Sequence, residues 1–444
     1  MKKTMRFIDL FAGMGGIRIG FENACNEYGI ESKCILTSEI KDIAIKALTN
    51  NFKHENLVGD IKNIETKDIP DFDVLLAGFP CQPFSSAGNR QGFSDTRGTL
   101  FFEIERILAD KRPYAFILEN VEGLVTHEIE TKNDKYGRTL KIILSKLEQL
   151  NYNVSWKLLD SKDFGVPQSR KRVYIIGTLD SKIDLDKFNK KEAKLIDILE
   201  TGLPVKDSHF TRCLLNHYSP EELYGKAIKD KRGGENNIHS WDIGLKGEIS
   251  EEQRELLEKL FKERRRKKWS AEIGISWMDG IPLTKDQIST FFESDNLKEI
   301  LDDLVEKGYL KLEHPKDKRL IESPDGTKRI KRVPIESKEK GYNIVAGKLS
   351  FEFTKILDPN DIAPTLVATD ANKLGVVDGS GIRQLSIREG LRLCGYPDTY
   401  NLSFFNNEKG MDAVYDLLGN TVVIPVIEEI AKKVIDTWSN KRHI

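Results

Sequence analysis

A cysteine stands between two prolines in the segment GFPCQPFSSAG, residues 78–88. Proline fixes the backbone φ angle, so Pro80 and Pro83 hold Cys81 in a stiff, exposed turn, whereas unreactive cysteines are usually buried in a core. A thiol held ready on a rigid loop is suited to act as a nucleophile. The alternative, an incidental turn cysteine, is disfavoured by the motifs that accompany it along the chain.

A carboxylate, Glu119, follows the apolar run Ala115–Leu118 and begins the tripeptide Glu119-Asn120-Val121. At the carboxyl end of a strand it would face the ligand crevice of an α/β sheet, although in isolation it could also cap the next turn. Thiol and carboxylate together suit chemistry on cytosine, because a thiolate added at carbon 6 makes carbon 5 able to take a methyl group from a sulfonium. A glutamate that a dry pocket keeps partly protonated can donate a proton or a hydrogen bond to ring nitrogen 3 as the thiolate adds.

Three polar side chains alternate in FGVPQSRKRVYIIG, residues 164–177: Gln168, Arg170 and Arg172. On an extended segment this spacing places all three on one face. Arginines can fix a base carbonyl oxygen and neighbouring phosphates. The alternative is ordinary surface charge.

A glycine-rich turn follows an apolar run in FIDLFAGMGGIRIGF, residues 7–21. Gly13, Gly15 and Gly16 let the backbone approach a nucleotide-like ligand closely. Arg18 occupies the place of the third glycine of the dinucleotide fingerprint, which disfavours NAD.

Two acidic residues follow the glycine turn at predicted strand ends. Glu39 lies 23 residues after Gly16, where it could hold ribose hydroxyls, and Asp60 in Gly59-Asp60-Ile61 could accept from an adenine amino group. A glycine turn alone is weak evidence. Followed in order by these two carboxylates, it predicts an adenosine-containing ligand, most simply S-adenosylmethionine.

The elements that must position these residues alternate along the first 180 residues. Short apolar strands are predicted at 6–11, 33–38, 74–77, 115–119 and 173–177, with helices at 41–50, 100–109 and 140–150 between them. Such alternation predicts a doubly wound, Rossmann-like α/β domain with a mostly parallel sheet. Ligands of such folds lie beyond the carboxyl ends of the strands, where the unusual residues fall.

The region from about 181 to 380 is more charged, and its strands are harder to predict. Residues 284–335 predict a helix, a break at Asp295-Asn296, a second helix, a strand and a hairpin turning at Pro324-Asp325-Gly326. This order is typical of a winged helix, a module that often enters DNA grooves. The alternative is a helical pair and a hairpin used only for packing.

Two basic clusters lie in the same region, although the net charge of the chain is only −1. A nucleic-acid binder of this overall charge must concentrate its positive charge locally. The alternative for each cluster is a solvated face. The first cluster comprises Arg264, Arg265, Arg266, Lys267 and Lys268, and the second Lys328, Arg329, Lys331 and Arg332.

Composition is that of a soluble globular protein, with 39% hydrophobic and 31% charged residues over a length that allows two or three domains. No run approaches the roughly 18 apolar residues of a transmembrane helix. The five cysteines form no C-x-x-C pair and have no histidine nearby at ligand spacing, which argues against zinc and disulfides and for a reducing cytoplasm. We therefore expect a cytoplasmic protein without a metal.

Taken together, the chain resembles the DNA (cytosine-5) methyltransferases, and closely the bacterial and phage restriction–modification type. Over about the first 170 residues, and again near the end, motifs occur in the family's order. They are the glycine motif, Glu39, Asp60-Ile61, Pro80-Cys81-Gln82, RGTLFFEIERIL (97–108), Glu119-Asn120-Val121, Gln168-x-Arg170-x-Arg172, RQLSIREGLRLCGYPDTY (383–400) and LLGNTVVIPV (417–426).

The resemblance implies catalytic and DNA-contact roles. The thiol of Cys81 would bond carbon 6 of the cytosine, Glu119 would contact nitrogen 3, and Arg172 would hold the base oxygen, supported by Arg170 and Gln168. The resemblance extends to DNA contacts at Gln82, Ser85 and, in APTLVAT (363–369), Thr365. To these we add the basic residues Arg264, Arg265, Arg266, Lys267, Lys268, Arg329 and Arg332 as expected DNA contacts.

The resemblance also implies a cofactor site for S-adenosylmethionine, with S-adenosylhomocysteine as product. Glu39 would take the ribose, and Asp60 and Ile61 the adenine. One departure is Ile40, where the family commonly has a tryptophan that stacks on adenine, so affinity should change modestly. The full expected set is Phe11, Gly13, Met14, Gly15, Gly16, Glu39, Ile40, Asp60, Ile61, Pro80, Leu100, Asn420 and Val422.

The expected organisation is a catalytic domain at 1–180 and 405–444, with the C-terminal helix returning to it, and a smaller target-recognition domain at 181–404 containing the winged helix. The substrate is then double-stranded DNA with a short specific site, whose cytosine is flipped into the pocket. We expect a monomer, and a cognate restriction endonuclease encoded nearby. Two alternatives stay open: a transfer RNA cytosine-5 methyltransferase, disfavoured by the long variable region, and a secondary role as a DNA-binding repressor.

Overall fold

The computed structural model describes residues 3–80, 99–129, 131, 134–230, 236–322, 328–345, 351–368, 370–405 and 408–441. Of the predicted residues, Cys81, Gln82 and Ser85 lie outside the described residues, as does the predicted turn at 324–326. The chain divides into two compact units. The first unit comprises Met1–Glu200, Asp358–Asn372 and Leu385–Ile444, and the second unit Thr201–Leu357 and Lys373–Gln384.

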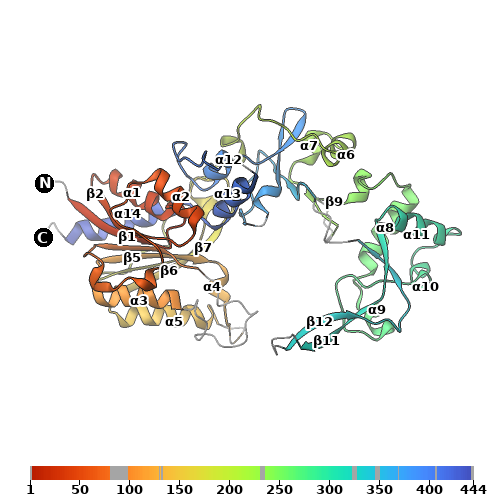
Figure 1. The fold of residues 1–444 in the computed structure, drawn as a ribbon, viewed down its shortest axis with the longest axis horizontal. Coiled ribbons are helices and arrows are strands. Elements are labelled where there is room, and N and C mark those ends of the chain that lie inside the picture. The colour runs from red at the N-terminus through yellow and green to blue at the C-terminus, as the bar shows by residue number, and fades with distance from the viewer. Residues whose placement is uncertain are drawn as a thin grey trace. The chain divides into compact units, whose positions relative to one another are not determined.

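The first unit is built on a seven-stranded sheet with the order β3-β2-β1-β4-β5-β7-β6 (Figure 1). The strands β1 to β5 run parallel to their neighbours, whereas β7 is antiparallel to both β5 and β6. The predicted doubly wound α/β fold with a mostly parallel sheet is therefore confirmed. The strands are β1 (Thr4–Leu10), β2 (Glu31–Ser38), β3 (Leu57–Val58), β4 (Val74–Gly78), β5 (Ala115–Val121), β6 (Asn153–Asp160) and β7 (Lys171–Thr178).

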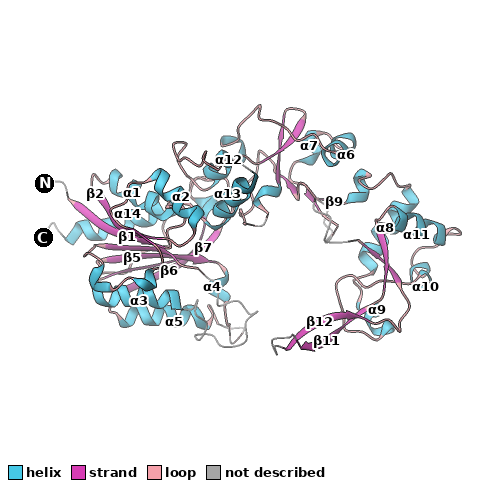
Figure 2. Cartoon of the chain, viewed as in Figure 1, coloured by secondary structure: helices cyan, strands magenta, loops and turns pink. Residues whose placement is uncertain are grey.

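Helices cover both faces of this sheet (Figure 2). One face packs against α1 (Gly16–Glu27) and α14 (Ile424–Lys441), and the other against α3 (Thr99–Lys111) and α5 (Arg138–Gln149). The remaining elements of the unit are α2 (Asp42–Asn51), α4 (Gly123–Thr126), α12 (Ile387–Leu393), α13 (Glu408–Asn420) and the short 3-10 turns η1 (Ile61–Asn63), η2 (Thr66–Asp68), η3 (Ser161–Asp163) and η4 (Leu195–Asp197).

Two apolar cores explain why these strands form the centre of the unit. Successive side chains of a strand point to opposite faces, so a strand covered on both sides is mostly apolar. In β1, Met5 and Phe7 belong to the core under α1 and α14, whereas Ile8 and Leu10 belong to the core over α3 and α5. The pattern leaves the strand ends as the place where polar residues can face a ligand.

The last helix, α14, packs along α1, although about 400 residues separate them in sequence. Polar contacts at its surface reinforce the apolar packing: the Tyr28 hydroxyl donates to Asp436 at 2.8 Å, and Lys432 forms ion pairs with Glu27 and Glu428. The segment that precedes α14 is thereby held against the start of α1, where Thr421 and Val422 lie close to Gly16.

The second unit contains a five-stranded sheet with the order β16-β15-β14-β8-β9. Its core includes Phe210, Leu214 and Phe353 and lies beneath α6 (His209–His217). The other elements here are α7 (Pro220–Leu223), β8 (Ala227–Ile228), β9 (Asn237–Ile238), η5 (Ser240–Ile243), β14 (Lys355–Ile356), β15 (Leu374–Asp378) and β16 (Gly381–Gln384). The short turn η6 (Ala371–Lys373) crosses the boundary between the two units.

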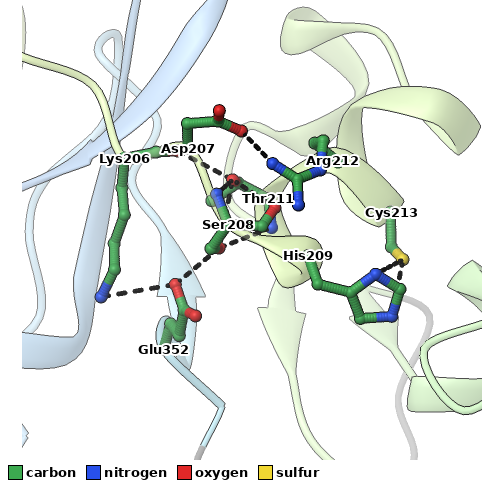
Figure 3. A network of polar contacts seen from close by, with 8 residues as sticks. All are labelled: Lys206, Asp207, Ser208, His209, Thr211, Arg212, Cys213 and Glu352. Atoms are coloured by element: carbon green, nitrogen blue, oxygen red, sulfur yellow. Dashed lines mark hydrogen bonds and ion pairs between the residues drawn. The ribbon is translucent and has the colours of Figure 1, made fainter.

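Polar contacts fix the start of α6 (Figure 3). Ser208 caps the helix by accepting from the Thr211 amide at 3.2 Å, and its own hydroxyl donates to Glu352 at 2.9 Å. Lys206 lies 3.4 Å from the same carboxylate. The expectation that no histidine lies near a cysteine at ligand spacing is wrong for one pair, because His209 Nε2 lies 3.6 Å from Cys213 Sγ, one helical turn away.

A second core of this unit gathers the helices α8 (Glu251–Glu263), α9 (Lys267–Ile273), α10 (Lys285–Ser289) and α11 (Leu297–Glu306) around the paired strands β10 (Leu310–Glu313) and β13 (Gly341–Ile344). The predicted hairpin is present as the antiparallel pair β11 (Lys316–Glu322) and β12 (Lys328–Pro334). Two helices, a strand and a hairpin thus follow in the predicted order; their assignment as a winged helix stays a prediction.

No helix among the described residues is long and apolar enough to cross a membrane. Within the same ranges, no group of three or more histidine, cysteine, aspartate or glutamate side chains is arranged to hold a metal ion.

Candidate active site

A cavity of about 730 Å³ lies in the first unit at the carboxyl ends of β1, β2, β4 and β5. Most of the residues predicted to bind the cofactor line it, together with Glu119, Arg170 and Arg172. The predicted lining residues are Phe11, Gly13, Met14, Glu39, Ile40, Asp60, Ile61, Pro80, Leu100 and Asn420. Residues that sequence reasoning gave no role also line it: Ser38, Lys41, Ala44, Lys62, Gly78, Phe79, Asn120, Val121, Leu417, Gly419 and Thr421.

The turn after β1 has a left-handed backbone at three positions, Phe11, Gly13 and Gly15, with φ of 55°, 55° and 76°. Such angles favour glycine because a Cβ is strained there. At Gly15 there is also no room, since a Cβ would lie 2.6 Å from the Phe52 ring. Gly15 therefore shapes the turn without lining the cavity.

Gly16 and Val422 likewise pack behind the cavity wall. A Cβ on Gly16 would lie 2.7 Å from the Tyr396 hydroxyl and 2.8 Å from Val422 Cγ2. Val422 belongs to the core under α1 and α14. The glycine permits the segment before α14 to approach the start of α1.

The carboxylate of Glu39 is fixed by three backbone amides at the end of β2. The Gly13 amide donates to one oxygen at 2.7 Å, and the amides of Ile40 and Lys41 donate to the other at 2.8 Å each. Backbone donors hold a carboxylate in one orientation without a competing cation. Asp60 is held more loosely, as the cap of the short turn that follows it, and lies 3.2 Å from Lys62 Nζ.

Glu119 lies beside Gly78 in the sheet register, because β4 and β5 are neighbours. A Cβ at Gly78 would be 3.6 Å from the Glu119 carboxylate. The sequence therefore brings this carboxylate to the strand end from which the chain continues through Pro80 to Cys81. Asn120 fastens the same point by donating to the Phe79 carbonyl at 2.9 Å.

The Glu119 carboxylate is buried and lies 3.1 Å from Arg172 Nε. Burial raises its pKa, because the charged form loses solvation, while the positive charges of Arg172 and Arg170 oppose the rise. A raised pKa increases the protonated fraction near neutral pH. The pair can therefore present either a proton or a charged acceptor to a ligand in the cavity.

Arg170 has its guanidinium almost fully buried, with 2% of the residue exposed. It donates to three backbone carbonyls, those of Leu366 at 2.8 Å, Gly419 at 2.9 Å and Thr421 at 2.6 Å. Desolvation by burial lowers the pKa of Arg170 to about 10, which leaves it charged at neutral pH. These hydrogen bonds connect the start of β7 to two other segments, one containing Leu366 and one containing Gly419 and Thr421.

Gln168 does not line the cavity. Its amide donates to the Leu393 carbonyl at 2.8 Å and accepts from the Leu366 amide at 3.0 Å. Thr365, the predicted phosphate contact, donates to the Ser169 carbonyl at 2.6 Å and is half-buried. The three alternating residues therefore lie in two different places: Gln168 is in the interior, whereas Arg170 and Arg172 line the cavity.

The first basic cluster is largely engaged inside the second unit. Arg264 is buried, with 3% exposed, and donates to the Asn343 side chain at 2.8 Å. Arg265 pairs with Asp279 at 2.8 Å, while Arg266 and Lys268 both lie near Glu263. The structure thus places Arg264 where its charge is not presented at the surface. Of this cluster, only Lys267 is exposed and has no carboxylate within ion-pair distance among the described residues.

The second basic cluster lies on the β11–β12 hairpin. Arg329 is exposed on β12. Arg332 is half-buried and donates to the backbone carbonyls of Ser276 and Trp277. The two predicted DNA contacts of this cluster therefore differ, one free to reach a ligand and one holding the hairpin.

One buried acid was not identified as a site residue from sequence. Asp9, in β1, is fully buried, and neither carboxylate oxygen has a hydrogen-bond partner among the residues that the structure describes. Desolvation by burial raises its pKa to about 8, against the opposing charge of Arg18. Its place within the motif FIDLFAG was the only sequence signal available.

A doubly wound sheet with a ligand-sized cavity at the carboxyl ends of its parallel strands defines the class of Rossmann-like domains that bind nucleotide-like cofactors. The chain belongs to the C-5 cytosine-specific DNA methylase family, whose match extends over residues 5–436. The family inferred from the sequence motifs is thereby confirmed: this protein is a DNA cytosine-5 methyltransferase.

Individual relatives extend this result over nearly the whole chain. Type II methyltransferase M.NlaIV of Neisseria lactamica is 58% identical over 435 residues, covering 98% of this chain and 100% of that protein. Type II methyltransferase M.BanI of Aneurinibacillus aneurinilyticus is 42% identical over 463 residues, covering 98% and 97%. The solved structure of S. pombe Dnmt2 methyltransferase, 15% identical with a TM-score of 0.53 and covering 98% and 99%, shows the likeness in fold alone.

Proposed function

We propose that this enzyme methylates carbon 5 of a flipped cytosine in a short specific site of double-stranded DNA, using S-adenosylmethionine and a covalent adduct at Cys81. The observation that carries the proposal is the shared cavity. Glu119 and Arg172 line the same cavity as Phe11 and Glu39, so a proton-bearing pair lies next to the predicted cofactor residues. Pro80, which precedes Cys81, is part of the same lining.

The residues present fit S-adenosylmethionine. A carboxylate held by three amides, Glu39, would accept from ribose hydroxyls, and Asp60 would accept from the adenine amino group. Apolar side chains, among them Phe11, Ile40 and Leu100, would enclose the purine and the methionyl chain. When bound, this cofactor supplies a methyl group on a sulfonium.

The chain's own residues then serve the cytosine. The Cys81 thiolate forms a bond to carbon 6, and the electron pair displaced in the ring makes carbon 5 nucleophilic. Protonated Glu119 donates to nitrogen 3, and Arg172 holds Glu119 and the base oxygen. After methyl transfer, loss of the carbon 5 proton to a base expels the thiolate, and nitrogen 3 returns its proton to Glu119, which restores the neutral ring. Gln168 and Arg170 act by positioning the segments around the cavity.

Type II methyltransferases of Neisseria are 56–58% identical to this chain, so we propose that it protects DNA in a restriction–modification system with a cognate endonuclease. The second unit would supply target recognition through its exposed cations, and Thr365 of the first unit would contact a phosphate. We further propose that the enzyme is a cytoplasmic monomer and requires no metal, which predicts full activity in the presence of a chelator.

The test is bisulfite sequencing of unmethylated plasmid after incubation with the enzyme and S-adenosylmethionine, with bulk transfer RNA as the alternative substrate. We expect cytosine methylation in one short sequence context of the plasmid and none in the RNA. Cys81→Ala should abolish methylation, because no bond to carbon 6 can form, while binding of S-adenosylhomocysteine and of duplex DNA largely survives. Methylation by Cys81→Ala, or of transfer RNA alone, would overturn the proposal.

A further inference from the structure

The β11–β12 hairpin is anchored at its root and extends outward from there. At the root, the Asp317 carboxylate accepts from the Ser276 amide at 2.9 Å, and Arg332 donates to the Trp277 carbonyl. Farther along, residues 318–320 and 329–331 are exposed. Within its own unit the ribbon extends past α9 (Figure 1). We call residues 318–322 and 329–331 the distal arm.

The distal arm carries cations directly opposite one another. The register pairs Arg319 with Lys331, and Lys318 with the root residue Arg332. Like charges at opposed positions destabilise a strand pair, so such pairs need a compensating anion. Among the described residues, no carboxylate within ion-pair distance is found for Lys318, Arg319, Arg329 or Lys331, whereas the root cation Lys316 pairs with Glu313 at 2.8 Å. The arm therefore has positive charge available for a partner.

The distal arm also exposes an apolar pair. Leu320 and Ile330 are opposed in the register and are 65% and 68% exposed. Side chains alternate between the faces of a ribbon, so this pair lies on one face and Arg319, Lys331 and Arg329 lie on the other. Water solvates aliphatic side chains poorly, so an exposed aliphatic pair beside unpaired cations indicates a surface that binds a partner.

We propose that the distal arm is a groove-reading ribbon for duplex DNA. A two-stranded β-ribbon fits the major groove, and apolar side chains there contact the methyl groups of thymine. The Leu320–Ile330 face would lie against the base edges, and the cations of the other face would reach the flanking phosphates. The partner is a polyanion because the arm carries four cations, Lys318, Arg319, Arg329 and Lys331, against the single carboxylate of Glu322. This inference rests on the proposed function, whose substrate is duplex DNA.

The first experiment measures binding of the full-length enzyme to a fluorescent 30-base-pair duplex pool of mixed sequence between 50 and 200 mM salt. Loss of two phosphate contacts in Arg319→Gln/Lys331→Gln should weaken binding about tenfold or more at 150 mM and lower the salt slope by about 1.8. The matched control is Lys259→Gln/Lys298→Gln, which removes two lysines already paired with Glu255 and Asp302. A double variant indistinguishable from this control overturns the proposal.

The second experiment maps methylated contexts by bisulfite sequencing for Leu320→Ser/Ile330→Ser. Both side chains are exposed, so folding and S-adenosylhomocysteine binding should be unchanged. We expect the salt slope to stay at the wild-type value, and discrimination at one position of the site to fall about 5- to 100-fold. Wild-type rate and context in this variant would overturn the base-reading role. A wild-type enzyme that methylates nothing would instead overturn the proposed function, while the binding measurement still reports on the hairpin.

Discussion

The cavity of the first unit and the hairpin of the second hold their charges in opposite ways. At the cavity, Glu119 and Arg170 are buried and each is fixed by specific partners. On the hairpin, Arg319 and Lys331 are exposed and face each other. A charge that must act on one atom benefits from a fixed, desolvated position, whereas a charge that must attract a polyanion works from solvent. Substitutions should therefore cause large, specific losses in the first region and small, salt-dependent ones in the second.

The largest effect is expected for Glu119→Gln. Loss of the proton donor to nitrogen 3 should lower kcat about 10²- to 10⁴-fold. The wild-type rate should fall as pH rises through the raised pKa of Glu119, because the protonated form is required, and the variant should lack this limb. Single-turnover methyl transfer from pH 5 to 9 measures both. If the variant kept the same fall in rate with rising pH, the proton would come from a group other than Glu119.

Arg170→Met tests whether buried charge in the first unit acts by positioning. Three buried carbonyls would lose their donor, so we expect the free energy of unfolding to fall by about 3–5 kcal/mol and S-adenosylhomocysteine binding to be lost with it. The matched variant is Arg264→Met, whose buried guanidinium donates to the Asn343 side chain in the second unit. It should lose about 1–3 kcal/mol and keep the ligand. Calorimetry and denaturant unfolding separate the two; equal loss of ligand binding would refute the positioning role.

Asp9→Asn should stabilise the protein, and most strongly at higher pH. The pKa of Asp9 is raised from 3.8 to about 8 in the folded protein, so the folded state binds a proton that the unfolded state has released between these values. Wild-type stability attributable to Asp9 therefore falls as pH rises from about 4 to 8, by about 1.4 kcal/mol for each tenfold difference in proton affinity. Thermal unfolding should show only a small advantage for the variant at pH 4.5 and a much larger one at pH 8. The reverse order would mean that Asp9 is ionised and stabilising.

The smallest effect is expected for Arg329→Gln on the hairpin. One lost phosphate contact should weaken duplex binding only a few-fold at 150 mM salt, with a change of about 0.9 in the salt slope. The free energy of unfolding should stay within about 0.5 kcal/mol, because the side chain is exposed. Fluorescence anisotropy and denaturant titration measure these. A large loss of stability would place Arg329 with the fixed charges of the first region and break the contrast.

Local sequence predicted the parts of the site that follow directly from strand ends. Glu39, Asp60 and Glu119 were found because each follows an apolar run, and the alternation of strands and helices gave the fold. The strand β6 was missed, since its sequence NVSWKLLD mixes polar and apolar residues. The domain boundaries stay predictions.

The partners of Arg170 and Gln168 could not be predicted, because they are fixed by the path of the chain. Arg170 bonds carbonyls 196 to 251 residues later, and no local spacing encodes such a contact. Arg264 was predictable in principle. Arg264 follows Leu257, Leu260 and Phe261 at helical spacing and therefore lies on the same buried face of the helix. Counting the consecutive charges of the cluster does not show on which face each one lies.

Glu39 and Gly419 line the same cavity, although they lie far apart in the sequence. During synthesis at about 5–20 residues per second, roughly 20–80 s would pass between these two residues. For that interval the nascent polypeptide has the glycine turn and the ribose carboxylate but lacks the opposite wall. Cofactor capture is therefore expected to begin only once the segment before α14 has emerged, so ribosome-bound fragments should be inert toward the genome.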